Sequence, residues 1–262
     1  MQAAWMLGAA GSILDQLWST MEERSLAGQL NFFEGIYRDL YLNLFSNNRW
    51  KLYLQGLGVT LEVSFFAVLL GLFLGTLIAM VRIPSFKNPA MRALQKFAGV
   101  YVSIIRGTPM VLQVLIINFG IFASANVSKI FIGIIACGLN SAAYVSEIVR
   151  GAILSVDKGQ IEAGRSLGLS SGKTMTHIVF PQALKIALPT LCNEFIVLIK
   201  ETSILSYIAL MELTKAGDYI RSKTYSAFAP YIITGVLYLI VTGVLSKLLS
   251  KLEKRLRQSD NR

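Results

Sequence analysis

Charged residues are scarce in this sequence of 262 residues. Asp, Glu, Lys and Arg make up 15% of it, against 54% hydrophobic residues, and the mean hydropathy is +0.56. A soluble domain carries about 25% charged residues, and a disordered or collagen-like chain needs a polar or glycine-periodic bias. The composition therefore excludes these classes and predicts an all-α integral membrane protein.

Cysteine and histidine are almost absent. Cys137 and Cys192 lie inside apolar stretches and match no metal or redox spacing, so we interpret them as packing residues. His177 has no second histidine with which to form a metal site or an acid–base pair. We find no catalytic constellation and predict a chain that is not itself an enzyme and that holds no metal.

Long apolar stretches dominate what is present, and about 20 apolar residues in a helix cross the roughly 30 Å hydrocarbon layer of a membrane. Five stretches have this length, at residues 58–81, 97–123, 130–146, 186–205 and 227–246. The second is interrupted by Arg106-Gly107-Thr108-Pro109, where proline removes a helix hydrogen bond. We therefore predict five transmembrane helices, the second of them broken or kinked.

The distribution of basic residues predicts the orientation. If the first span runs inward, fifteen of the 25 Lys and Arg residues fall in the inner segments 82–96, 149–185 and 247–262, and seven in the outer segments. By the positive-inside rule the N-terminus is then outside and the C-terminus in the cytoplasm. This bias accounts for most of the net charge of +10, so we predict no nucleic-acid partner.

The N-terminal region, residues 1–55, is the hardest part to interpret. Residues 3–14 are apolar but short, with no basic residue before them, which argues against a cleaved signal peptide. Residues 32–53 mix aromatic, aliphatic and charged side chains. This pattern suits a helix at the membrane interface, and it suits an ordinary extracytoplasmic extension about as well.

The loop between the third and fourth spans is long, and long loops are often functional. It contains Glu162-Ala163-Gly164, then Gly168, Ile178 and Phe180-Pro181. The small residues let another surface approach closely, Gly168 can end one short helix, and Pro181 can begin the next. A solvated helix–turn–helix without a partner is the alternative interpretation.

This spacing resembles the coupling loop of ABC importer permeases, which reads Glu-Ala-Ala, three residues, Gly, nine residues, Ile, one residue, Leu-Pro. Gly164 replaces the second Ala and Phe180 replaces Leu. The resemblance implies that residues 151–181 dock on a separate ATPase subunit. The coupling residues that it implies are Glu162, Ala163, Gly164, Gly168, Ile178 and Pro181.

A segment of the same loop, residues 168–174, looks like a phosphate-binding loop. It has three residues between its glycines where that motif needs four, and it follows no predicted strand. We therefore expect no cofactor in this chain, with ATP and Mg bound by the partner ATPase.

Four further segments look like polar amino acid permeases: residues 106–113, 140–147, 155–160 and 193–195. The resemblance covers residues 56–252 as a transmembrane domain, leaving the extension 1–55 and a cytoplasmic tail, 253–262. It implies a bacterial cell membrane protein with a second permease subunit, ATPase subunits, an extracytoplasmic substrate-binding protein and a polar amino acid as substrate.

Polar side chains within the spans are where contacts with substrate are expected, because a charge at the centre of a bilayer is costly and normally faces the protein interior. Asn140, Tyr144 and Glu147 share one helix face. Each such residue also fits hydrogen bonding between helices or an interfacial position. The full set is Glu62, Arg106, Asn140, Tyr144, Glu147, Asn193, Glu194 and Lys200.

Two alternatives stay open at this point. One is an importer of another small polar solute, such as an opine or an osmolyte. The other is a channel or membrane enzyme that works without ATP. The sequence does not choose among amino acids, and it does not say whether two copies of this chain pair or this chain pairs with a paralogue.

Overall fold

A computed structural model describes residues 19–20, 24, 31–83 and 88–260, and the description of side chains ends at Lys251. The apolar segment 3–14 and the side chains of the tail lie outside the described residues.

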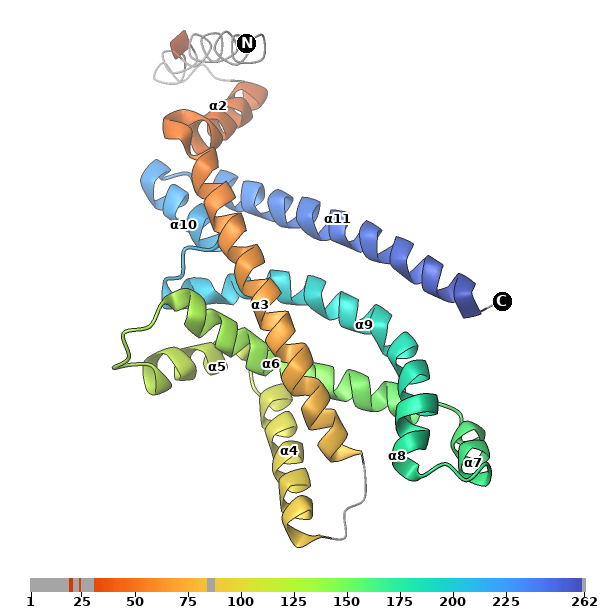
Figure 1. The fold of residues 1–262 in the computed structure, drawn as a ribbon. Helices are drawn as coiled ribbons and strands as arrows, with labels where there is room; N and C mark the ends of the chain where they lie inside the picture. Colours follow the sequence, from red (N-terminus) through yellow and green to blue (C-terminus); the bar gives the residue numbers. More distant parts are fainter. Residues whose placement is uncertain (1–18, 21–23, 25–30, 84–87, 261–262) are drawn as a thin grey trace, which may run out of the picture.

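All elements in the described part are helical (Figure 1). They are α2 (Phe32–Leu44), η1 (Ser46–Asn48), α3 (Trp50–Arg82), α4 (Pro89–Gly107), α5 (Met110–Ile116), η2 (Ile117–Ile121), α6 (Lys129–Leu154), α7 (Lys158–Ser166), α8 (Ser171–Thr174), η3 (Met175–Val179), α9 (Phe180–Glu201), η4 (Thr202–Ile208), α10 (Leu213–Thr224) and α11 (Ala229–Asp260).

Four helical stretches are long and apolar enough to cross a membrane: Ser46–Arg82, Lys129–Leu154, Ser171–Ile208 and Ala229–Lys251. A fifth candidate is the pair formed by α4 and the stretch Met110–Ile121, which are bent by 111° at a short break. The break falls at Arg106–Pro109, where it was predicted, because α4 ends at Gly107 and Pro109 caps α5. The all-helical fold and the broken second helix are thus confirmed.

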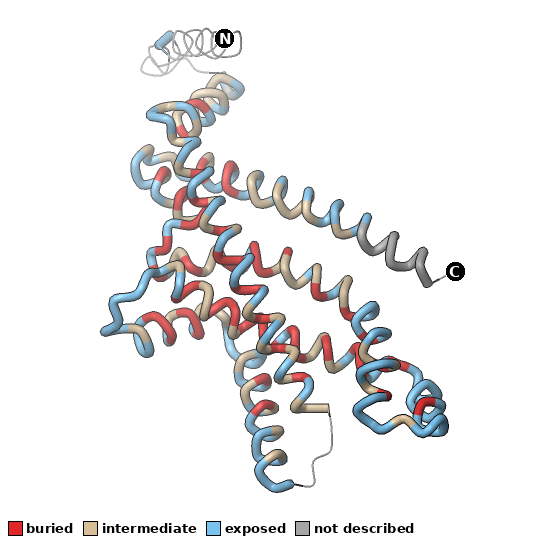
Figure 2. Tube along the Cα trace, viewed as in Figure 1, coloured by how far each residue is buried: buried red, intermediate tan, exposed pale blue. Residues whose placement is uncertain are grey.

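Close packing between α3 and α6 forms the centre of the bundle, and two glycines make it possible. A Cβ atom on Gly71 would lie 2.8 Å from Ser141 Oγ, and one on Gly75 would lie 2.7 Å from the carbonyl oxygen of Ala142. The small-xxx-small spacing of these glycines is typical of helix packing in membranes. Buried residues are concentrated where α3, α6 and α9 meet (Figure 2).

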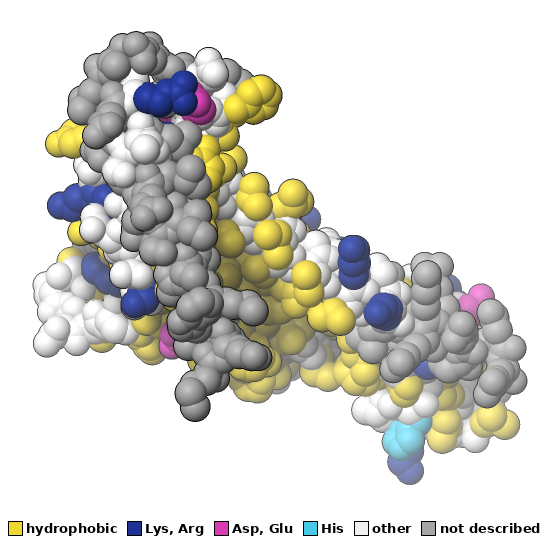
Figure 3. Space-filling view, turned by 90° about the horizontal axis from the view of Figure 1, so that it is seen from above, with side chains coloured by type: hydrophobic (Ala, Val, Ile, Leu, Met, Phe, Trp, Pro, Cys, Tyr) yellow, Lys and Arg dark blue, Asp and Glu magenta, His cyan; other side chains and the backbone are white. Residues whose placement is uncertain are grey.

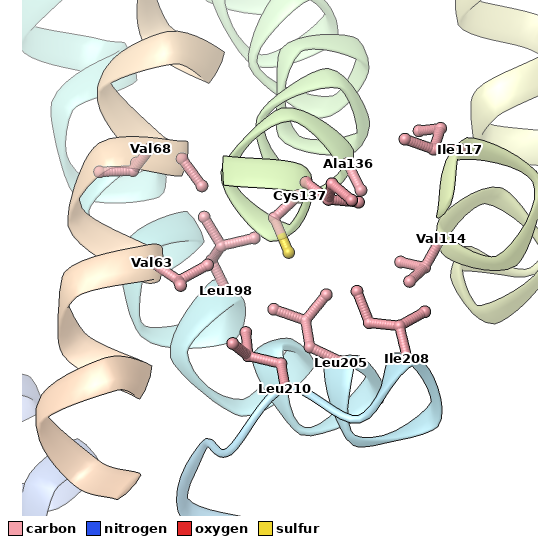
Figure 4. Packing of buried hydrophobic residues seen from close by; sticks show 12 residues of the cluster. Val63, Val68, Val114, Ile117, Ala136, Cys137, Leu198, Leu205, Ile208 and Leu210 are labelled. Carbon is pink, nitrogen blue, oxygen red and sulfur yellow. The ribbon is translucent and has the colours of Figure 1, made fainter. Parts of the chain in front are cut away.

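The main apolar core lies between α3, α5, α6, α9 and η4 (Figure 4). Cys137 points into it beside Val63, Leu198 and Leu205, and is fully buried. Its role as a packing residue is confirmed, while Cys192 is partly exposed on α9.

Helix α11 packs on the bundle mainly through its first turns. Ile233 and Thr234 are buried, and Thr234 approaches Gly217 of α10, where a Cβ atom would lie 2.3 Å from Thr234 Oγ1. Farther along, apolar residues such as Leu239 and Val244 are exposed. Hydrophobic side chains cover much of the surface seen in Figure 3, as expected for a helix bundle surrounded by lipid.

Candidate coupling surface and intramembrane polar cluster

Helix α7 is a short helix with a defined cap at each end. Asp157 Oδ1 accepts a hydrogen bond of 2.6 Å from Gly159 N at its start. At its end Gly168 has φ +80°, and the N–H groups of Gly168 and Leu169 donate to the carbonyl oxygens of Arg165 and Gly164. This is the Schellman pattern, in which glycine takes the left-handed conformation at little cost. Gly168 therefore ends the helix, as the sequence predicts.

Helix α7 packs against the next helical segment through Gly164. This glycine is buried, and a Cβ atom on it would lie 2.7 Å from Ile178 Cδ1 and 3.1 Å from Thr174 Cγ2. Ile178 lies in η3, which leads directly into α9 with Pro181 in its first turn. The structure thus brings Gly164 and Ile178 together and joins α7 to the membrane-spanning helix α9.

Other positions on α7 and at its C-terminal end are exposed. Glu162, Ala163 and Gly168 are exposed, and Leu167 is 83% exposed. Ala163 and Gly168 are small, so another surface can approach α7 closely beside Leu167. Leu167 lies at the α7 C-cap and stands outside the motif that identified the loop, so the motif alone did not single it out. We call Glu162, Ala163, Leu167 and Gly168 the α7 surface.

Within the bundle, Glu147 of α6 lies between three arginines. Its carboxylate is hydrogen-bonded to Arg82 of α3, lies 2.8 Å from Arg150 Nη2, and lies 3.9 Å from Arg106 Nη1. The Arg106 guanidinium also lies over the Tyr144 ring, 5.5 Å from its centroid. Of the predicted pathway residues, Arg106, Tyr144 and Glu147 are therefore brought together. We call these three with Arg82 and Arg150 the arginine cluster.

The arginine cluster carries three positive charges and one negative charge, so it has a surplus of two positive charges. Arg106 is the most exposed of its arginines and belongs to the turn that ends α4. A cationic surplus attracts carboxylates, which guanidinium groups bind through paired hydrogen bonds. The cluster can thus bind a small anionic group that enters from the open side of α4.

The break between α4 and α5 is held by Gln113, which is buried. Its Nε2 donates to the carbonyl oxygens of Ile105 (2.7 Å) and Thr108 (3.1 Å), and to Thr108 Oγ1 (2.9 Å). Its Oε1 accepts a bond of 2.9 Å from Asn140 Nδ2 of α6. One amide therefore replaces helix hydrogen bonds that the break removes. Asn140 thereby contacts α5, away from the arginine cluster.

The other polar candidates lie elsewhere. Glu194 Oε1 accepts a bond of 3.0 Å from Ser141 Oγ, at the point where Gly71 brings α3 close to α6. Glu62 on α3 is exposed in this chain, as are Asn193 and Lys200 on α9. The sequence-predicted set therefore divides between the arginine cluster, the Gln113 contact, the Ser141 contact and exposed helix faces.

Within the described ranges, no three His, Cys, Asp or Glu side chains converge on a point where a metal ion would bind. Residues 168–174 form the turn after α7 and the short helix α8, whose N-cap Ser170 accepts from Lys173 N.

The chain matches the family described as "Binding-protein-dependent transport system inner membrane component" over residues 67–258. It is 35% identical to the arginine transport system permease protein ArtQ of Bacillus subtilis over 79% of this chain and 93% of that protein. It is 36% identical to the glutamine transport system permease protein GlnP of Escherichia coli, over the same shares of the two chains.

A solved structure described as an amino acid ABC transporter with histidines superposes with a TM-score of 0.72. The identity is 41%, over 78% of this chain and 94% of that chain. These relatives are thus matched over nearly their whole length, while about a fifth of this chain lies outside each match.

Proposed function

Because the chain belongs to the family of binding-protein-dependent transport system inner membrane components, we propose that it is the permease subunit of an ABC importer for polar amino acids. Relatives carry names of arginine and glutamine permeases, and a similar solved structure contains histidines. The permease forms the translocation pathway, and a separate ATPase subunit binds ATP and Mg. A second permease subunit and an extracytoplasmic substrate-binding protein complete the importer.

The observation that carries this proposal is the connection between the α7 surface and the membrane-spanning bundle. Gly164 packs on Ile178, and η3 continues into α9 without a break. A movement imposed on α7 is therefore transmitted to α9 through a packed contact and a continuous helix. Rigid-body displacement of this kind is a known mode of conformational switching.

The polar faces of α4 and α6 supply the pathway in this proposal. Lys96, Gly99 and Ser103 line an open pocket on α4 that also includes Arg82 of the arginine cluster. Val100 and Ile104 also line this pocket. Charged side chains such as Arg82 and Lys96 are costly against lipid. They fit a face that meets water and the second permease subunit. Glu62, Asn193, Glu194 and Lys200 are proposed as further pathway residues on α3 and α9.

Purification of the complex from native membranes in mild detergent tests the assignment. We expect an ATPase subunit to co-purify and its ATP hydrolysis, measured with the substrate-binding protein across the twenty amino acids, to rise with one or a few of them. A chain that purifies alone and stays inert toward ATP would favour a channel or membrane enzyme. Stimulation by an opine or osmolyte alone would keep the importer and change its substrate.

The α7 surface has its own test, with Leu167→Asp and Gly168→Trp as the disruptive variants. Gly168→Asn is the matched control, because asparagine tolerates the left-handed conformation and adds little bulk. We expect the first two to lose amino acid uptake at least tenfold while inserting normally, and the control to keep most of it. Normal uptake by well-inserted Leu167→Asp and Gly168→Trp variants would remove the docking assignment.

A further inference from the structure

Helix α2 lies outside the matched region, which begins at residue 67, and it presents an exposed apolar face. Phe33, Ile36 and Leu40 are 80%, 45% and 38% exposed, and their spacing places them on one side of the helix. Glu34 and Arg38 lie toward the other side. A helix with this division is typical of one that lies in a membrane surface.

The position of α2 is fixed by the bundle. Asn43 is fully buried, and its Oδ1 accepts a bond of 2.8 Å from Thr224 Oγ1 at the end of α10. The turn into α3 contains Asn47 and Asn48 with φ 54°, and the Arg49 guanidinium donates to the Leu42 carbonyl oxygen. Helix α2 is therefore held in a defined corner, with contacts to α10 and α11 (Figure 1).

The end of the bundle at which α2 lies carries the marks of a membrane–water boundary. Trp50 begins α3, Tyr225 follows α10 and Tyr231 lies in the first turn of α11, and all three are exposed. Trp and Tyr are enriched where a bilayer meets water. Asp218 of α10 also contacts Lys215 and Arg221, as expected for a helix in contact with water.

Lipid-facing surface begins directly beside α2. Phe228 and Ile232 at the start of α11 are 77% and 60% exposed, and α11 is a candidate membrane span that packs against α2. Helix α2 therefore packs beside a candidate membrane span that carries exposed apolar side chains. The contact with α11 and the exposed Trp50, Tyr225 and Tyr231 side chains together indicate that lipid covers the apolar face of α2.

We propose that α2 is a membrane-surface anchor, whose Phe33, Ile36 and Leu40 side chains insert among the lipids of the leaflet at which α3 begins. It braces the first turns of α3 and α11 against that surface. Helix α2 lies outside residues 67–258, the part of the chain that the family model matches, so the anchor is an addition to that shared part. The proposal depends on the membrane location of the chain and not on its substrate or on its ATPase.

Spin labels on the full complex in vesicles of phosphatidylethanolamine and phosphatidylglycerol test this. Single cysteines at Phe33, Ile36 and Leu40 are compared with one at Arg38, in a background where Cys137→Ala and Cys192→Ala have been checked for normal folding. We expect the first three labels to collide more often with oxygen, which concentrates in lipid, than with a water-soluble nickel complex. The Arg38→Cys label should show the opposite ratio.

Two results would overturn the anchor. High nickel accessibility at all four positions would show that the apolar face meets water. Low accessibility to both reagents at Phe33, Ile36 and Leu40 would show that another protein surface covers it. Either result would leave the importer assignment intact, since the labels report only where α2 lies.

Discussion

At the scale of single residues, Glu147 is the countercharge of the arginine cluster. Removing it leaves Arg82, Arg106 and Arg150 facing one another in a partly buried site without a countercharge. We expect Glu147→Gln to lose at least tenfold in uptake in proteoliposomes. The matched control is Asp218→Asn, an acid on α10 that also pairs with a lysine and an arginine but lies outside the proposed pathway. Equal activity in the two variants would argue against a central role for the cluster.

Gln113 is the second residue on which the site depends. In Gln113→Leu the carbonyl oxygens of Ile105 and Thr108 lose their shared donor, and an unsatisfied buried polar group costs about 1–3 kcal/mol. Thermal denaturation of the purified complex should show this loss of stability. Leu112→Ala, a change at an exposed neighbour, should have a much smaller effect. A Gln113→Leu protein as stable as wild type would contradict the role of Gln113 in holding the break between α4 and α5.

The sequence revealed only part of these contacts. Asn140, Tyr144 and Glu147 share a face of α6, as their spacing predicts. The face is about 10 Å long at 1.5 Å per residue, so its two ends meet different neighbours. Asn140 meets Gln113 of α5, and Glu147 meets Arg82 of α3, which is 65 positions away. Only tertiary packing decides which neighbour each end meets.

At the scale of helices, glycines distinguish close contacts from open surfaces. A Cβ atom on Gly75 would meet the Ala142 backbone and Val145, which cannot move aside, whereas on Gly164 it would meet the mobile end of Ile178. Overpacking of this kind costs about 1–3 kcal/mol.

We expect Gly75→Ala to destabilise the complex by that amount. Gly164→Ala should be nearly neutral, and so should Gly235→Ala on the open side of α11. Equal denaturation midpoints for all three would refute the close approach of α3 and α6.

Glu212 caps α10 and joins it to α11. Its fully buried carboxylate accepts hydrogen bonds from Thr214 N and Lys215 N, each 2.7 Å, and from Tyr238 Oη, 3.0 Å. Burial raises the pKa of Glu212, although these hydrogen bonds oppose the shift. Folding then favours protonated Glu212. The stability that this residue contributes is therefore greatest at pH values below the ordinary pKa of glutamate, and it is lost as pH rises through the raised pKa of the folded state.

Two variants separate these effects. Glu212→Ala should lower stability by about 1–3 kcal/mol because it leaves three donors without their acceptor. Glu212→Gln keeps an acceptor and carries no charge, so its denaturation midpoint should be less dependent on pH than that of wild type. A wild-type midpoint that, relative to that of the Gln variant, rises as pH approaches the ordinary pKa of glutamate from below and is constant above it would show that the hydrogen bonds outweigh burial.

The helices themselves were predicted well where apolar length defines them and poorly elsewhere. The break at Arg106–Pro109 was predicted from the proline. The start of this span was predicted at residue 97, whereas α4 begins at Pro89. The difference arises because residues 89–96 are too polar to be recognised as part of an apolar stretch. Helix α10 was not predicted, since its twelve residues carry several charges and its burial depends on Gly56 and Gly217.

At the scale of the whole molecule, the distribution of basic residues predicts that the first span runs from the outside to the cytoplasm. With the proposed orientation, a cysteine in place of Asp218 on α10 lies outside, and one in place of Lys251 near the end of α11 lies in the cytoplasm. In intact spheroplasts a membrane-impermeant maleimide should label the first and should label the second only after permeabilisation. The reverse pattern would invert the proposed topology.

The hydrogen bonds by which Gln113 holds the break between α4 and α5 also have a consequence for how the chain is made. The donors to Ile105 and Thr108 come from Gln113, which is eight and five residues downstream, whereas Asn140 is 27 residues beyond Gln113. At about 5–20 residues per second, Asn140 is synthesised roughly one to five seconds later. During biogenesis the bent segment can therefore satisfy its own backbone before α6 exists, and the arrival of α6 fixes a bend that is already formed.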